Sequence, residues 1–282
     1  MLEVKNLCKT YPSFRLDNVS FSLPKGLICG FIGQNGAGKT TTLKCIMRAV
    51  VADAGEVFVD GREMNGCEGQ IKQDVSFTVG AFDYYRNEKL SKIAKVYRSF
   101  YTRWNDEKFA EYCQKFNLDL NKRVKELSAG MKVKFALALA MSHDAKLFIF
   151  DEPTSGLDPI ARDELLDVFR DIVEEGDKSI LFSTHITSDL EKCADTILFI
   201  KNGKIAVDMP KDELLESHVL IKGGNDLLTD ALKENVVAYK QNSFGFSALA
   251  KRQNIGDLSL FVTEKPTLDD IIVYYNKEGK LN

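Results

Sequence analysis

The segment Gly33–Thr40, which reads G-Q-N-G-A-G-K-T, restricts the folds open to this chain more than any other feature. The apolar run Leu27–Ile32 precedes it, and a predicted helix over Thr40–Val50 follows it. Glycines allow the backbone to curl, so that several N–H groups face one point beside the positive end of the helix. A strand, a glycine loop and a helix in this order predict a phosphate-binding loop, and a tight turn without a ligand is the alternative.

Charged and hydroxyl side chains complete the predicted phosphate site. Lys39 places a cation near the outer phosphates, and Thr40 offers a hydroxyl to Mg²⁺. The apolar run Leu147–Phe150 ends in Asp151 and Glu152, at the end of a strand where open α/β sheets bind ligands. Asp151 can hold Mg²⁺, and Glu152 can polarise the water that attacks the terminal phosphate.

The order of the predicted elements indicates the fold class. Apolar runs at Lys146–Phe150 and Ser179–Ser183 predict further buried strands. Helices are predicted over Ser128–Ser142 and Ala161–Glu175. Strands that alternate with helices predict an α/β fold with a mainly parallel sheet.

Length and charge exclude several classes of protein. The chain has 282 residues, 44% of them hydrophobic and 28% charged, which is typical of a globular protein. The formal net charge of -3 argues against a protein that binds nucleic acid through bulk charge. No apolar stretch is long enough to span a membrane, and no signal peptide is expected. The six cysteines lack metal-binding spacing, so free thiols are expected.

The segment 84–122 differs from the alternating pattern around it. It is rich in charged and aromatic residues and carries a helical stripe of apolar side chains: Ile93, Val96, Tyr97, Phe100 and Tyr101. We expect a helical insertion here, within about 84–142. The stripe either packs on the core or forms part of a docking face for a partner.

Three more elements give the chain a family resemblance. The sequence Leu127-Ser128-Ala129-Gly130-Met131 precedes an apolar helix, Ser155-Gly156-Leu157-Asp158 closely follows Glu152, and His185 follows a predicted strand. In this order, after the phosphate loop, these elements resemble the nucleotide-binding subunit of ABC transporters over residues 1 to about 210. The sequences Ala81–Lys132, Ser183–Leu190 and Pro266–Ile271 are similar to exporter ATPases of the bacitracin-resistance and acetoin-utilisation types.

The resemblance implies an α/β fold of the ABC type and an ATPase. Its mainly parallel core sheet would carry an antiparallel N-terminal β-subdomain and a helical subdomain, with a small α+β extension after the nucleotide-binding domain. The implied domains are 1–210 and 211–282. Short strands at 218–221 and 235–239, a short helix at 225–233 and a terminal helix capped at Thr267 are expected in the second.

The resemblance also implies a site shared by two subunits in a head-to-tail dimer. Ser128, Ala129 and Gly130 of one subunit would contact ATP on the other, and Asp158 would communicate across the dimer. His185 would orient the attacking water, and Tyr11 would stack on adenine. The expected nucleotide contacts from the loop are these: Gly33, Gln34, Asn35, Gly36, Ala37, Gly38, Lys39, Thr40 and Thr41.

Two departures from the family pattern stand out. Ala129 occupies the position of a usual glycine, and Met131 that of a usual glutamine. In the segment that normally carries a coupling glutamine, Gly80 stands in its place. Gln73 lies too early and Asp83 too late to replace that glutamine, so no residue is assigned to its role.

The implied partner is a separate membrane-spanning permease, with the chain in the cytoplasm on the inner face of the membrane. Export is favoured, and no nucleic-acid partner is expected. Two alternatives stay open at this point: an ABC ATPase acting on DNA or ribosomes, and a degenerate module that senses nucleotide without hydrolysing it. The single cassette and the absence of room for a long coiled coil argue against the first, and Lys39, Asp151 and Glu152 against the second.

Overall fold

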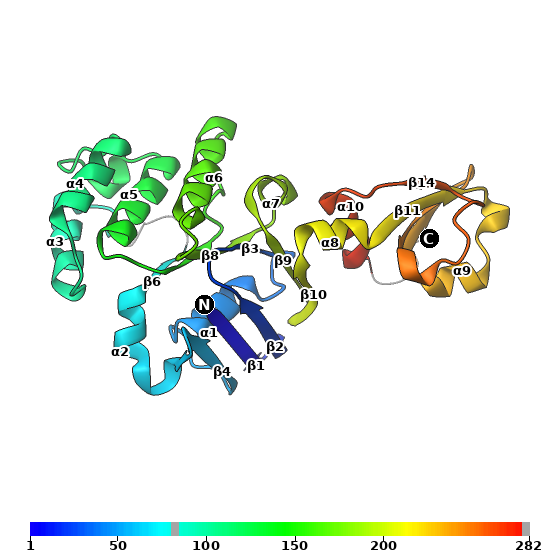
Figure 1. Cartoon of the computed structure of the whole chain (residues 1–282), viewed down its shortest axis with the longest axis horizontal. Helices are drawn as coiled ribbons and strands as arrows, with labels where there is room; N and C mark the ends of the chain where they lie inside the picture. Colours follow the sequence, from blue (N-terminus) through cyan, green and yellow to red (C-terminus); the bar gives the residue numbers. More distant parts are fainter. Residues whose placement is uncertain (80–84, 278–282) are drawn as a thin grey trace. The chain divides into compact units, whose positions relative to one another are not determined.

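The computed structural model describes residues 1–79 and 85–277. The chain divides into two compact units, Met1–Asp208 and Met209–Asn282, which are taken in turn (Figure 1). The first unit contains two sheets and a group of helices, and the second contains one further sheet. Within 1–79 and 85–277, no helix has both the length and the apolar character needed to cross a membrane.

A six-stranded sheet in the order β10-β9-β3-β8-β7-β6 forms the centre of the first unit. The pairs β3/β8, β3/β9, β7/β8 and β6/β7 are parallel, as the alternating pattern predicts. Every residue of β3, β7 and β8 is buried, which explains their uninterrupted apolar runs. The strands are β3 (Ile28–Ile32), β6 (Val75–Val79), β7 (Leu147–Asp151), β8 (Ser179–Thr184), β9 (Thr196–Lys201) and β10 (Lys204–Pro210).

An antiparallel sheet in the order β2-β1-β4-β5 makes up the N-terminal part of this unit. Its inner face shares a hydrophobic core with the central sheet, in which Leu16 and Val19 are buried with Phe31. The mixed architecture of parallel core and antiparallel N-terminal sheet is therefore confirmed. The strands are β1 (Leu2–Tyr11), β2 (Phe14–Leu23), β4 (Ala54–Val59) and β5 (Arg62–Glu63).

Helices cover the central sheet and continue into the insertion. Against β7, the ring of Phe169 on α6 stacks on Phe150, with 5.1 Å between their centroids. Replacing such a buried phenylalanine with alanine lowers the free energy of unfolding by about 3–5 kcal/mol. The helices of the unit are α1 (Lys39–Ile46), α2 (Met64–Asp74), α3 (Leu90–Phe100), α4 (Asp106–Lys115), α5 (Ala129–Ser142), α6 (Pro159–Val173) and α7 (Thr187–Cys193).

Helix α1 is shorter than the predicted span Thr40–Val50, because it ends at Ile46. Arg48 adopts a left-handed backbone with φ 52°, and the N–H groups of Ala49 and Val50 both return to the carbonyl of Lys44. This is the pattern of a helix C-cap, here without the glycine that usually signals it.

The apolar stripe of the insertion is partly buried and partly exposed to solvent. Ile93 on α3 is buried, whereas Val96 is 45% exposed and Phe100 is 70% exposed. Part of the stripe therefore packs on the protein, and part of it faces outward from the first unit. Residues 80–84, which include the Gly80 and Asp83 considered above, lie outside the described residues.

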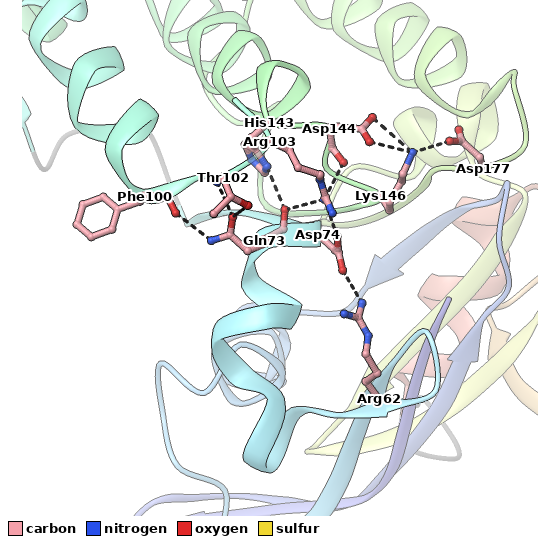
Figure 2. Close-up of polar contacts among 10 residues, drawn as sticks. All are labelled: Arg62, Gln73, Asp74, Phe100, Thr102, Arg103, His143, Asp144, Lys146 and Asp177. Atoms are coloured by element: carbon pink, nitrogen blue, oxygen red, sulfur yellow. Dashed lines mark hydrogen bonds and ion pairs between the residues drawn. The ribbon is translucent and has the colours of Figure 1, made fainter. Parts of the chain in front are cut away.

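Polar contacts attach the link between α3 and α4 to the C-terminal end of α2 (Figure 2). The side-chain oxygen of Gln73 accepts from the Thr102 N–H at 2.9 Å, and its amide donates to the Phe100 carbonyl at 2.9 Å. Next to it, the Asp74 carboxylate pairs with Arg62 and Arg103, each at 2.5 Å. The side chain of Gln73 therefore holds the link between α3 and α4, within the insertion, against the end of α2.

His143 lies next to this junction, with its Nδ1 3.3 Å from the Gln73 carbonyl (Figure 2). Its ring stacks on Tyr101 with 3.7 Å between centroids. The side chain is 1% exposed, and its Nε2 has no hydrogen-bond partner among the described residues. Burial lowers the pKa of His143 to about 4, so the ring is neutral at pH 7.

The second unit is an antiparallel sheet in the order β12-β13-β11-β14, covered by helices. The strands are β11 (His218–Gly223), β12 (Val236–Gln241), β13 (Phe246–Lys251) and β14 (Val262–Glu264), and the helices are α8 (Lys211–Glu216), α9 (Asp230–Asn235) and α10 (Leu268–Asn276). A capping box between Thr267 and Asp270 begins α10, as predicted. The predicted helix at 225–233 is wrong in extent, because a 3₁₀ turn, Asn225–Leu227, precedes α9.

Candidate active site

The loop between β3 and α1 has the curled backbone that its glycines predict. Gly36 has φ 82° and Gly38 has φ 116°, both in the left-handed region. Gln34, Asn35 and Gly36 are exposed, whereas Gly33, Ala37 and Gly38 are buried against the core. The exposed rim therefore presents backbone N–H groups at the N-terminus of α1.

Lys39 lies at the centre of the loop and is only 6% exposed. Its Nζ donates to the Gly33 carbonyl at 2.6 Å and lies 3.4 Å from Oε1 of Glu152. A buried ammonium needs such partners to offset its lost hydration. A phosphate in the loop would provide a stronger anionic partner at the same position.

Thr40 and Asp151 meet across the end of the sheet. The Thr40 hydroxyl donates to Oδ2 of Asp151 at 2.7 Å, while the Ser183 hydroxyl donates to Oδ1 at 2.6 Å. The Asp151 carboxylate, at the end of β7, is therefore held by hydroxyl groups from the start of α1 and from β8. Hydroxyl and carboxylate oxygens side by side are ligands that Mg²⁺ accepts, so this pair fits that ion.

Glu152 is held between the loop and His185. Its N–H donates to the Ser183 hydroxyl at 2.9 Å and to the Ser183 carbonyl at 3.1 Å. Its Oε2 lies 2.7 Å from Nδ1 of His185. Glu152 has φ 54°, an uncommon conformation for a residue other than glycine, which directs the chain sharply away after β7.

Most of these residues line one open cleft of about 490 Å³, whereas the predicted site residues Gly33, Ala37 and Asp151 do not. Of the predicted residues, it is lined by Gln34, Asn35, Gly36, Gly38, Lys39, Thr40, Thr41, Glu152 and His185. Phe14 and Ser155 also line it and were not expected. Tyr11, predicted as the adenine contact, is absent from this lining; it ends β1 and is 38% exposed.

The segment Leu127–Met131, the family's signature sequence, does not line the cleft. Ser128 caps α5 by accepting from the Met131 N–H at 3.2 Å, and neither Ala129 nor Gly130 lines the cleft. Asp158 caps α6, with its Oδ1 accepting from the N–H groups of Ile160 and Ala161, each at 3.0 Å. A single chain therefore brings together the phosphate loop and the carboxylates but not the signature.

Comparisons with known proteins agree with this geometry. Residues 16–155 match the family described as ABC transporter. The ABC transporter ATP-binding protein YtrB of Bacillus subtilis is 30% identical over 223 residues, which cover 79% of this chain and 76% of that protein. The lantibiotic transport ATP-binding protein SrtF of Streptococcus pyogenes is 32% identical over 235 residues, covering 79% of this chain and 99% of that protein.

The fold has a close counterpart among solved structures. The structure of an ATP-binding subunit of an ABC transporter aligns with a TM-score of 0.69 and 26% identity, over 77% of this chain and 92% of that chain. The two relatives and the solved structure each leave about a fifth to a quarter of this chain uncovered. The chain therefore belongs to the ABC transporter family, as a subunit that binds and hydrolyses ATP to power transport.

Proposed function

We propose that ATP binds in this cleft with its phosphates against the loop Gly33–Gly38. Lys39 holds the outer phosphates in place of its present partners, and Thr41 adds a contact from the first turn of α1. Backbone N–H groups and the helix dipole supply the rest of the attraction. The proposal is supported by the buried Lys39, whose Nζ already lies within 3.4 Å of a carboxylate oxygen.

Glu152 is the proposed base. It accepts a proton from the water that attacks the terminal phosphate, while His185 orients the carboxylate and hydrogen-bonds that phosphate. The single observation that carries this assignment is the 2.7 Å contact between Glu152 and His185 at the rim of the cleft that holds Lys39.

Thr40 and Asp151 are the proposed holders of Mg²⁺. The 2.7 Å hydrogen bond between them places a hydroxyl and a carboxylate oxygen together at the first turn of α1. When bound, Mg²⁺ would neutralise charge on the outer phosphate oxygens. Ser183 keeps the Asp151 carboxylate fixed for that role, because it donates to the other oxygen.

The complete site is proposed to need two subunits arranged head to tail. In one subunit, Ser128, Ala129 and Gly130 begin α5 and do not line its own cleft. A second subunit would offer these N–H groups to the terminal phosphate, and Asp158 would lie near the same junction.

The transport partner is proposed to be a separate membrane-spanning permease, which would place the chain on the cytoplasmic face of the membrane. The outward side chains of α3, Val96 and Phe100, are the proposed docking face. We propose residues 1–210 as the nucleotide-binding domain and 211–282 as an accessory region. Export is the proposed direction, from the resemblance of Ser183–Leu190 and Pro266–Ile271 to exporter ATPases.

The test is ATP hydrolysis by the purified full chain. Phosphate release is measured as a function of protein concentration. The Lys39→Ala variant should bind no ATP, and retained affinity would remove the loop from the assignment. Pull-down of the tagged chain from detergent-solubilised membranes should recover one polytopic permease. Recovery of nucleic acid or ribosomes instead would overturn the transport assignment.

A further inference from the structure

A second side-chain contact joins the segment after β7 to the segment after β8. The Thr154 hydroxyl donates to Oδ2 of Asp189 at 2.7 Å, across 35 positions of sequence. Thr154 is fully buried, and Asp189 is 1% exposed. Thr154 lies shortly after Glu152, and Asp189 lies shortly after His185. This hydrogen bond therefore ties together the same two segments as the contact between Glu152 and His185.

The two contacts differ in their access to water. The side chains of His185 and Glu152 are 50% and 24% exposed, so water competes for both groups and holds their contact weakly. The hydrogen bond between Thr154 and Asp189 is shielded from water, and breaking it would leave buried polar atoms without partners. The buried bond is therefore the stronger constraint on how the two segments lie.

Short turns connect the ends of this buried bond to the site. The Ser155 N–H, next to Thr154, donates to the Glu152 carbonyl at 3.2 Å. The Asp189 N–H donates to the carbonyl of Ile186, the residue after the histidine, at 3.3 Å. A shift of either end of the bond would therefore pass through one turn to a side chain that lines the cleft.

The other carboxylate oxygen of Asp189 is poorly satisfied. Its Oδ1 lies 3.8 Å from Nε of Arg162 on α6, and neither atom has a hydrogen-bond partner among the described residues. A buried carboxylate that is only partly paired is weak evidence of a stabilising role.

We propose that Thr154 and Asp189 are positioning residues, whose hydrogen bond holds Glu152 and His185 in place for ATP hydrolysis. Neither of the two lines the cleft, so both act through their neighbours. This inference rests on the proposed roles of Glu152 and His185.

The test removes the bond in two ways that separate positioning from stability. Thr154→Val keeps the shape of the side chain, removes the hydroxyl and leaves the Asp189 carboxylate unpaired. Thr154→Val/Asp189→Leu replaces both partners with apolar groups, which relieves the unpaired carboxylate but does not restore the bond. Phosphate release gives kcat and KM, equilibrium titration gives ATP affinity, and thermal unfolding gives the midpoint temperature. Turnover is measured well below every midpoint, so that folded chains are compared.

Thr154→Val should lower kcat about ten- to a hundredfold with little change in KM or ATP affinity, because misplaced reacting groups slow the chemical step. The double variant should have a higher midpoint temperature than Thr154→Val and the same low kcat. Thr154→Ser, which keeps the hydroxyl, should restore kcat. Ser188→Ala, at an exposed position in the same turn of α7 as Asp189, is the control and should match the unchanged chain.

Three results would overturn the inference. Full kcat in Thr154→Val would mean that the bond does not position the site. Recovery of kcat together with the midpoint temperature in the double variant would mean that the bond only stabilises the fold. A loss confined to KM would assign it to ATP binding instead. Failure of the proposed function is distinguishable, because the unchanged chain would then not hydrolyse ATP, or Glu152→Gln would hydrolyse it at the normal rate.

Discussion

Nδ1 of His185 lies 2.7 Å from Oε2 of Glu152, although the two residues are 33 positions apart in sequence. Glu152 follows β7 and His185 follows β8, so the parallel pairing of these strands creates the contact. The other carboxylate oxygen of Glu152 faces Lys39. One carboxylate thus joins the phosphate loop to the histidine, and the effect of changing either neighbour can be predicted.

Glu152→Gln should retain ATP and stop hydrolysing it. The amide keeps the shape of the side chain but cannot accept a proton from water, so turnover should fall by about 10²–10⁴-fold. Phosphate release measured beside equilibrium ATP binding checks this. Glu174→Gln, which alters an exposed glutamate at the end of α6, is the control and should hydrolyse normally. Ordinary turnover by Glu152→Gln would show that another group is the base.

His185→Ala should lower turnover with little change in ATP affinity, because the ring positions Glu152 at the rim of the cleft. The two side chains act as a unit, so their effects should not add. The double variant His185→Ala/Glu152→Gln should turn over no more slowly than Glu152→Gln alone. Independent, multiplied losses would argue that His185 acts without Glu152.

Gly38→Ala should disrupt the loop. The new Cβ would require a strained backbone at φ 116° and would lie 2.6 Å from Cδ2 of Leu16. The expected cost is about 1–3 kcal/mol of unfolding free energy, together with loss of ATP binding. Chemical denaturation and ATP titration measure the two effects. Gly69→Ala is the matched control, since a Cβ there would meet no atom within 4 Å apart from the local backbone of its own helix, and its φ lies outside the left-handed region.

Gly130→Ala should fold normally and fail to dimerise on ATP. Its Cβ would make ordinary contacts, 3.5 Å from Cβ of Ala161 and 3.7 Å from Cδ2 of Leu157. The midpoint temperature of thermal unfolding should therefore stay unchanged. The added methyl group should nevertheless obstruct the close approach of the phosphate of ATP bound to the opposing subunit. Size-exclusion chromatography in the Glu152→Gln background reads out the dimer. A normal ATP-dependent dimer would count against a phosphate contact at Gly130.

Stability should fall as the pH drops from 6.5 toward 4, partly because of His143. Its folded-state pKa of about 4 lies below the ordinary value of 6.5, so the unfolded chain binds the proton more tightly in this window. At pH 5 the loss from this group is about 2 kcal/mol relative to pH 7. Urea denaturation at both pH values should show a smaller difference for His143→Gln. An equal difference in both proteins would mean that other groups carry the pH dependence.

The sequence predicted the buried core strands and the helix starts well, because each depends on local signals. The uninterrupted apolar runs of β3, β7 and β8 follow from burial on both faces, and the caps Ser128 and Thr267 lie where a polar side chain precedes an apolar helix. The family resemblance, rather than spacing, suggested that His185 belongs with Glu152.

Features that depend on long-range packing could not be predicted this way. Phe14 reaches the cleft because β2 packs beside the start of α1, which no local pattern around residue 14 reveals. The early end of α1 depends on a left-handed arginine, and the strands β13 and β14 have no clear alternation. Gln73 forms hydrogen bonds with Phe100 and Thr102, which are distant from it in sequence, so no local pattern predicts these contacts.

The separation of the signature from the cleft within one chain has a kinetic consequence. Ser128 caps α5 and is not among the residues that line the cleft. Each molecule therefore carries the phosphate loop of one reaction centre and the signature sequence of another. Under the head-to-tail arrangement, dilute protein should hydrolyse ATP at a rate that rises with the square of its concentration. Once a permease holds two copies together, that second-order dependence should disappear, and the rate per subunit should become independent of dilution.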